Sequence, residues 1–164
     1  MKKILSFLIA AAVLFGVCSC GMNGGGAHAG FSPKDENDTL LKSFYDMAES
    51  GDENLSAKKI AESVASTKKF PLNLSVFEQE AGWLAGFNEE IGGFVSCAKF
   101  APMIGAQPFV GYIFELEKGS DVKSFIEKLD SAADLRWNIC TSADKKVSDS
   151  VGVYVFYMLC PSKY

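Results

Sequence analysis

The chain has 164 residues, of which 48% are hydrophobic and 22% charged, and its formal net charge is −4. This composition is too apolar for a disordered chain and lacks the period of collagen or a coiled coil, so we expect one compact domain. An acidic pI near 5.0 without a Lys/Arg-rich run excludes a nucleic-acid-binding protein that works through bulk positive charge.

The first residues have the features of a secretory signal segment. Lys2 and Lys3 precede a largely apolar run of fourteen residues, 4–17. A helix needs about 20 apolar residues to cross a bilayer, so this run is short for a permanent transmembrane anchor. A buried helix of the domain is the alternative, but the two lysines and the glycine-rich stretch that follows argue against it. We therefore predict export.

Residues 17–20 close this segment with a cysteine. Val17-Cys18-Ser19-Cys20 resembles the lipobox of bacterial lipoproteins, in which an aliphatic, a variable and a small residue precede the cysteine that receives the lipid. The resemblance implies a signal peptide of residues 1–19, cleavage after Ser19 and a lipid on the Cys20 thiol. The alternative is an ordinary secreted protein in which Cys18 and Cys20 are plain thiols.

A lipid on Cys20 would hold the protein on a membrane of the cell envelope, because two or more acyl chains anchor a protein stably. Gly21 stands where an acidic residue would mark retention at the inner membrane, by analogy with the family. We therefore expect the outer membrane in a cell with two membranes, and the outer face of the plasma membrane in a cell with one.

Residues 20–37 are predicted to form a flexible tether. Residues 21–30 are small, uncharged and rich in glycine, and the whole segment would hold the domain roughly 20 Å from the lipid. His28, the only histidine, lies in this segment. We expect it to be solvated rather than to bind a metal.

The predicted domain spans residues 38–164 and begins with two helices. The first has Asp38 or Thr39 as its N-cap, and the second starts at Ser56 and ends at residues 68–71. Both have apolar residues at helical spacing. These are Leu40, Leu41, Phe44, Met47 and Ala48 in the first helix, and Ala57, Ile60, Ala61 and Val64 in the second.

From residue 72 onward the pattern favours strands. Alternation predicts strands at 72–76, 94–100, 109–117 and 135–139, a third helix after Gly119-Ser120 and a polar turn at 143–150. Residues 151–160 are apolar on both faces, as expected of a central covered strand. The sequence therefore predicts an α+β fold with about three helices and a mostly antiparallel sheet of four or five strands.

Three cysteines remain in the predicted domain, namely Cys97, Cys140 and Cys160, all in predicted strands. One pair could form a disulfide in an oxidising compartment, or all three could be small buried hydrophobic residues. A catalytic thiol is disfavoured because the domain has no histidine to act as a base. The ligand spacings of zinc sites are also absent, so we expect no metal and no cofactor.

The candidate ligand-binding residues are Arg136, Trp137 and Trp83. Arg136 is the only arginine, a side chain suited to binding carboxylate or phosphate, and Trp137 could add stacking. An ion pair with Asp134 is the alternative for Arg136. Trp83 lies in a glycine-rich aromatic loop, 82–94, which could present rings to a ligand or fill the core with them.

The leading hypothesis is a lipid-anchored envelope protein whose small domain binds an unknown protein or small molecule without catalysis. Its expected partners are the membrane, through the N-terminal lipid, and this unidentified ligand, but no nucleic acid. We identify no catalytic residue. The alternative is an envelope enzyme, either a hydrolase or a thiol-dependent enzyme, that uses scattered carboxylates or a free cysteine.

Overall fold

The computed structural model describes residues 27–104 and 106–164. The predicted signal peptide (1–19), the lipidation site Cys20 and the tether residues 20–26 lie outside the described residues. The elements, in chain order, are α1 (Glu36–Ala48), α2 (Ala57–Ala65), β1 (Leu74–Gln79), β2 (Gly82–Trp83), β3 (Glu90–Ile91), β4 (Ser96–Pro102), β5 (Val110–Glu115), α3 (Val122–Ala132), β6 (Lys145–Val151) and β7 (Tyr154–Cys160).

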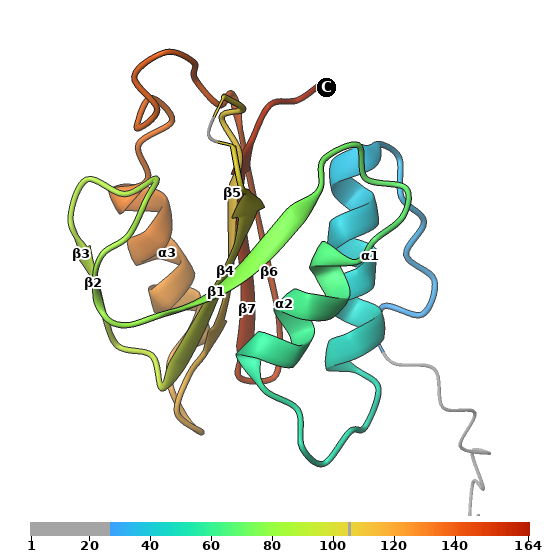
Figure 1. The fold of residues 1–164 in the computed structure, drawn as a ribbon. Coiled ribbons are helices and arrows are strands. Elements are labelled where there is room, and N and C mark those ends of the chain that lie inside the picture. Colours follow the sequence, from blue (N-terminus) through green and yellow to red (C-terminus); the bar gives the residue numbers. More distant parts are fainter. Residues whose placement is uncertain (1–26, 105) are drawn as a thin grey trace, which may run out of the picture.

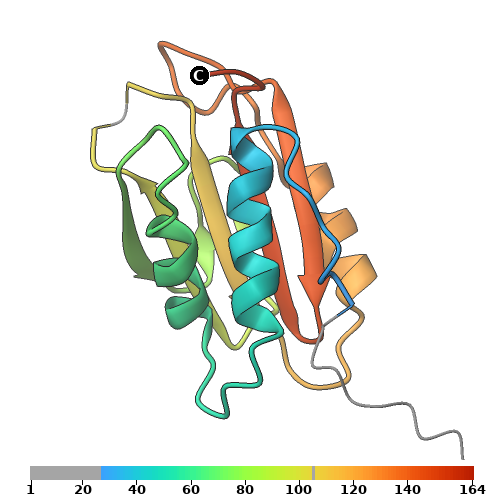
Figure 2. The same cartoon turned by 90° about the vertical axis from the view of Figure 1, so that its right-hand side faces the viewer.

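A five-stranded sheet lies between two layers (Figure 1). Its strand order is β1-β4-β5-β7-β6, and every neighbouring pair is antiparallel. Helices α1 and α2 cover one face, as the view onto that face shows (Figure 2), and α3 with the small β2–β3 sheet covers the other. The predicted α+β class, with three helices and an antiparallel sheet, is confirmed.

The N-cap of helix α1 lies three residues before Asp38, the first of the two predicted caps. Asp35 has extended backbone angles, and its side chain accepts the backbone N–H of Asp38. Asp35 is therefore the N-cap, and the prediction of Asp38 or Thr39 was wrong. Helix α2 starts as predicted, because Ser56 accepts the N–H of Lys59 at 3.3 Å.

Strand β7 is covered on both faces, as its sequence predicts. Alternate side chains enter two separate cores: Phe156, Met158 and Cys160 pack under α1 and α2, whereas Val155, Tyr157 and Leu159 pack under α3. The apolar residues of the third helix pack on this second core, as expected from their spacing.

Two expectations near the C-terminus were wrong. Residues 145–151 form β6 instead of a polar turn, and the turn itself lies at Gly152, whose φ of +59° suits the first central position of a two-residue hairpin. Residues 135–139 form a loop instead of a strand. The end of α3 is held by backbone bonds from Asp134 N–H to Gly86 and from Asn88 N–H to Ala132, which direct the chain away from the sheet.

The chain from residue 27 to residue 37 is packed on the domain, which corrects the extent of the predicted tether. The His28 ring stacks on Tyr45, with centroids 4.0 Å apart, and Phe31 packs edge-on against the same ring. Among the described residues, packing on the domain therefore begins at His28, because these rings bury apolar surface against α1. Within the described residues, no helix is long and apolar enough to cross a membrane.

Candidate functional site

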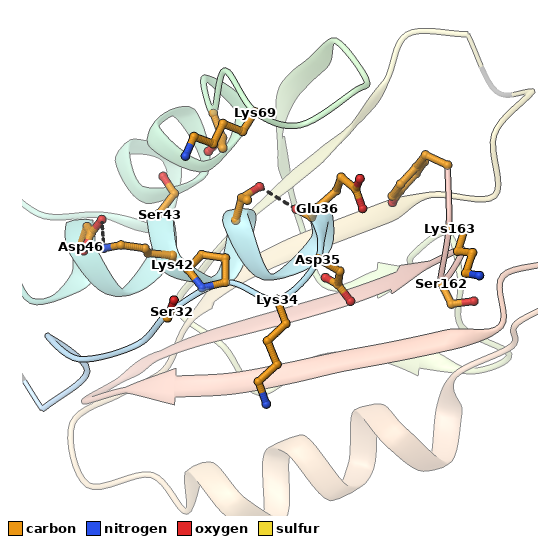
Figure 3. Close-up of a pocket in the computed structure, with 14 residues that line it drawn as sticks. Ser32, Lys34, Asp35, Glu36, Lys42, Ser43, Asp46, Lys69, Ser162 and Lys163 are labelled. Atoms are coloured by element: carbon orange, nitrogen blue, oxygen red, sulfur yellow. Dashed lines mark hydrogen bonds and ion pairs between the residues drawn. The ribbon is translucent and has the colours of Figure 1, made fainter.

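An open groove of about 1180 Å³ runs along the outer surface of α1 (Figure 3). Ser32 and Lys34 lie on one side and Lys69 on the other, and Ser162 and Lys163 lie at one end. Thr67 and Tyr164 also line the groove. The lining side chains are mainly lysines, carboxylates and hydroxyls, so the groove offers hydrogen bonds and charges of both signs.

A buried asparagine fixes the C-terminal end of the groove. Asn37 has no exposed surface; its Nδ2 donates to the carbonyl of Pro161 at 3.0 Å, and its Oδ1 accepts the hydroxyl of Tyr164 at 2.9 Å. The Tyr164 ring packs edge-on against Phe70, 5.1 Å away. Burial, more than the nearby acidic groups, raises the pKa of Tyr164, so the phenol keeps the proton that it donates.

Ion pairs satisfy part of the charge in the groove. Lys42 contacts Asp46 at 2.8 Å, and Lys145 contacts Asp35 at the same distance. Burial alone would raise the pKa of Asp35, but the hydrogen bond from Lys145 and the backbone N–H of Asp38 outweigh it and lower the pKa below its usual value. Asp35 therefore stays ionised at the entrance to α1.

Three further lysines, Lys34, Lys69 and Lys163, line the groove and form no ion pair with any other described residue. They are exposed and lie on different walls of the groove (Figure 3). Glu36 adds a carboxylate to the same lining, and no salt bridge joins it to another described residue. The groove therefore offers charges of both signs to a polar ligand or peptide.

Thr67 also lines the groove, and the sequence analysis did not identify it as a functional residue. Its hydroxyl oxygen is buried and has no hydrogen-bond partner among residues 27–104 and 106–164. A buried hydroxyl without a partner costs about 1–3 kcal/mol. A turn of the Thr67 side chain toward the groove would let a bound molecule supply the missing bond.

A second hollow of about 590 Å³ adjoins the groove and shares Lys163 and Tyr164 with it. Loop residues 71–72, 107–108 and 141–142 complete it. Loops at this end of the sheet (Figure 1) also carry exposed apolar side chains. Met103, Ile104 and Ile139 are the most exposed large apolar residues of the described chain, and Ile139 is 99% exposed.

The three predicted ligand-binding residues do not form one site. Trp83 is 70% exposed and pairs with Glu90 in the small sheet, whereas Trp137 is half-buried against the core under α3. Arg136 is exposed, and its backbone N–H, not its guanidinium group, bonds to Asp134 at 2.8 Å. No contact among the described residues joins these three side chains.

The three cysteines are free thiols, so none of the disulfides considered from sequence is formed. Cys97 and Cys160 are buried in the two different cores, on opposite faces of the sheet. Burial raises the pKa of Cys160 to about 12 and that of Cys97 further, which keeps both thiols protonated and unreactive. Cys140 is exposed, and it lies in a loop rather than in the predicted strand.

Comparison with known proteins gave no match. No protein-family model, no curated protein and no solved structure is significantly similar to this chain.

Proposed function

We propose that this chain is a lipid-anchored protein of the bacterial envelope whose domain binds a partner in the groove along α1. Residues 1–19 would be the signal peptide and Cys20 the lipidated residue, in the outer membrane of a two-membrane cell or on the outer face of the plasma membrane otherwise. The lysine pair, the short apolar run and the Val17–Cys20 sequence support this proposal.

The geometry of α1 indicates which end of the domain would face the membrane. His28 contacts Glu49 at the C-terminal end of α1, whereas the C-terminal tail contacts Asn37 at the opposite end. A helix of 13 residues separates these ends by about 20 Å. Because Cys20 precedes His28 by only eight residues, the anchor would hold the His28 end near the membrane. The tail end of the groove would then face outward (Figure 2).

The observation that carries the binding proposal is the unpartnered Thr67 hydroxyl in the wall of the groove. A hydrogen-bonding ligand, either a small polar molecule or a polar segment of a protein, would satisfy it once the Thr67 side chain turns toward the groove. If Thr67 serves binding and not folding, Thr67→Val should raise the free energy of unfolding by about 1 kcal/mol, because it removes an unsatisfied group without changing the shape of the side chain. Lower stability would contradict this assignment.

The anchor is tested by paired cysteine variants. Cys20→Ser should move the protein from the membrane fraction to the soluble extracytoplasmic fraction, whereas the matched control Cys18→Ser should remain on membranes. Intact mass of the extracted wild-type protein should match a chain that starts at Cys20 and carries acyl groups. A Cys20→Ser protein that stays on membranes, or an unprocessed chain with Met1 in the cell interior, would refute the proposal.

A further inference from the structure

Residues 27–31, which we call the strap, are held against the C-terminal half of α1. The His28 ring lies face to face with Tyr45, with the two planes only 4° apart and the centroids separated by 4.0 Å. Phe31 packs against the same ring at 5.1 Å, and its N–H donates to the carbonyl of His28 at 2.8 Å. The strap therefore has its own turn and a shared aromatic contact with the helix.

Glu49 binds the strap from the end of α1. Its Oε1 lies 2.7 Å from Nδ1 of His28, and the same oxygen accepts the backbone N–H of His28 at 3.2 Å. The Glu49 side chain is only 14% exposed. Helix α1 has no basic residue in its last turn, where its dipole favours a positive charge. A protonated His28 would supply that charge from outside the helix.

The charged groups around the two stacked rings are acidic. The Tyr45 hydroxyl donates to Asp149 of β6. Burial first, and then Asp149, raises the pKa of Tyr45, and Asp38 and Glu49 act in the same direction. Tyr45 thus remains a neutral phenol whose ring face attracts a cation. Asp149 of β6 contacts the Tyr45 hydroxyl and Glu49 contacts the His28 ring, so a carboxylate lies at each of the two stacked rings.

We propose that the strap is a pH-sensitive clamp that fixes where the N-terminal segment leaves the domain. The clamp closes when His28 is protonated and pairs with Glu49, and it loosens when the ring is neutral. Its consequence for anchoring rests on the proposed lipid on Cys20. With the clamp closed, the chain between Cys20 and His28 can span at most about 28 Å, because it has eight residue steps. With the strap released, the first fixed residue would be Asp35, and the chain between Cys20 and Asp35 can span about 50 Å.

Hydrogen exchange of residues 27–31 tests the clamp in the processed full-length protein held in detergent. Measured at about pH 5.5 and about pH 8, on either side of the range in which histidine titrates, and corrected for intrinsic rates, exchange should be about fivefold slower at the lower pH. Glu49→Gln keeps the shape of the side chain but removes its charge, so it should abolish this difference. Glu53→Gln, which alters an exposed carboxylate nearby, is the matched control and should leave the difference unchanged.

Proton NMR gives a second readout, because His28 is the only histidine and its ring signals need no further assignment. Stacking on Tyr45 should shift these signals upfield in the wild type at low pH, and less so in Glu49→Gln. Exchange that is equal at both pH values and unchanged in Glu49→Gln would overturn the clamp. Both readouts are independent of the lipid, so a Cys20→Ser protein that keeps them but stays on membranes would refute the anchor and leave the clamp standing.

Discussion

Gly111→Ala tests the packing between β4 and β5 on the face that α1 and α2 cover. Gly111 lies on β5 opposite Phe100 of β4, and an added Cβ would lie 2.2 Å from two atoms of the Phe100 ring. Ordinary contacts begin at 3.4 Å, so the ring and the strand would have to separate by about 1.2 Å (3.4 minus 2.2).

The Phe100 ring has little room to move away. It has no exposed surface, and the rings of Phe109 and Phe156 pack against it with centroids 6.0 and 5.7 Å away. Overpacking a core costs about 1–3 kcal/mol, and the surrounding rings favour the upper end of that range. For a domain of this size, about 3 kcal/mol lowers Tm by roughly 10 °C.

The assay is urea and thermal unfolding followed by circular dichroism, with Gly92→Ala as the matched control. A Cβ at Gly92 meets only the Ala81 side chain, at 3.6 Å, so this variant should stay within about 0.5 kcal/mol of wild type. Adding Phe100→Leu to Gly111→Ala should cost less than the two single changes combined, because the smaller side chain relieves the clash. A Gly111→Ala protein as stable as the control, or strictly additive effects, would refute the reasoning.

Three further outcomes are expected. Asn37→Ala should lower the free energy of unfolding by about 1–3 kcal/mol, since it leaves the C-terminal tail without its buried partner; an unchanged urea midpoint would contradict this role. The pKa of Asp35 is lowered, so its pair with Lys145 contributes stability above the unfolded-state pKa and loses it as the pH falls. Between about pH 7 and about pH 3, the Tm of Lys145→Gln should therefore fall by less than the Tm of wild type. The fall for the control Lys118→Gln should equal that of wild type. A maleimide should modify Cys140 but neither of the buried cysteines until the domain unfolds; labelling of the native core would count against the fold.

Elements whose pattern depends on their own residues could be predicted from the sequence. Alternate residues of β5, namely Val110, Tyr112 and Phe114, enter one core, as the alternation in the sequence predicts. The N-cap Ser56 could be predicted because it bonds only to the backbone of its own helix. Residues 135–139 alternate in the same way but do not form a strand. The backbone hydrogen bonds that fix the start of this loop involve Gly86 and Asn88, which lie more than forty residues earlier in the chain. A contact between residues so far apart cannot be predicted from a local sequence pattern.

The candidate site could not be predicted either, because its residues are far apart in the sequence. Asn37 and Tyr164 are 127 residues apart in sequence, and neither stands out until the fold brings them together. His28 was placed in a solvated tether because its neighbours are glycines, whereas its position is set by Tyr45 and Glu49. For the glycine-rich aromatic loop, the sequence left two alternatives, core filling and exposure to a ligand. Phe87 fills the core, whereas Trp83 is exposed.

Strand β7 has a consequence for how the molecule is made. It is synthesised after the other described strands, yet it lies inside the sheet, between β5 and β6. Before residues 154–160 are synthesised, only part of the apolar sheet surface that α1 and α2 cover is present. The earlier strands alone cannot complete either core, because β7 contributes side chains to both. A truncation that removes β7 would therefore take out an inner strand of the sheet and part of both cores, and not an edge strand.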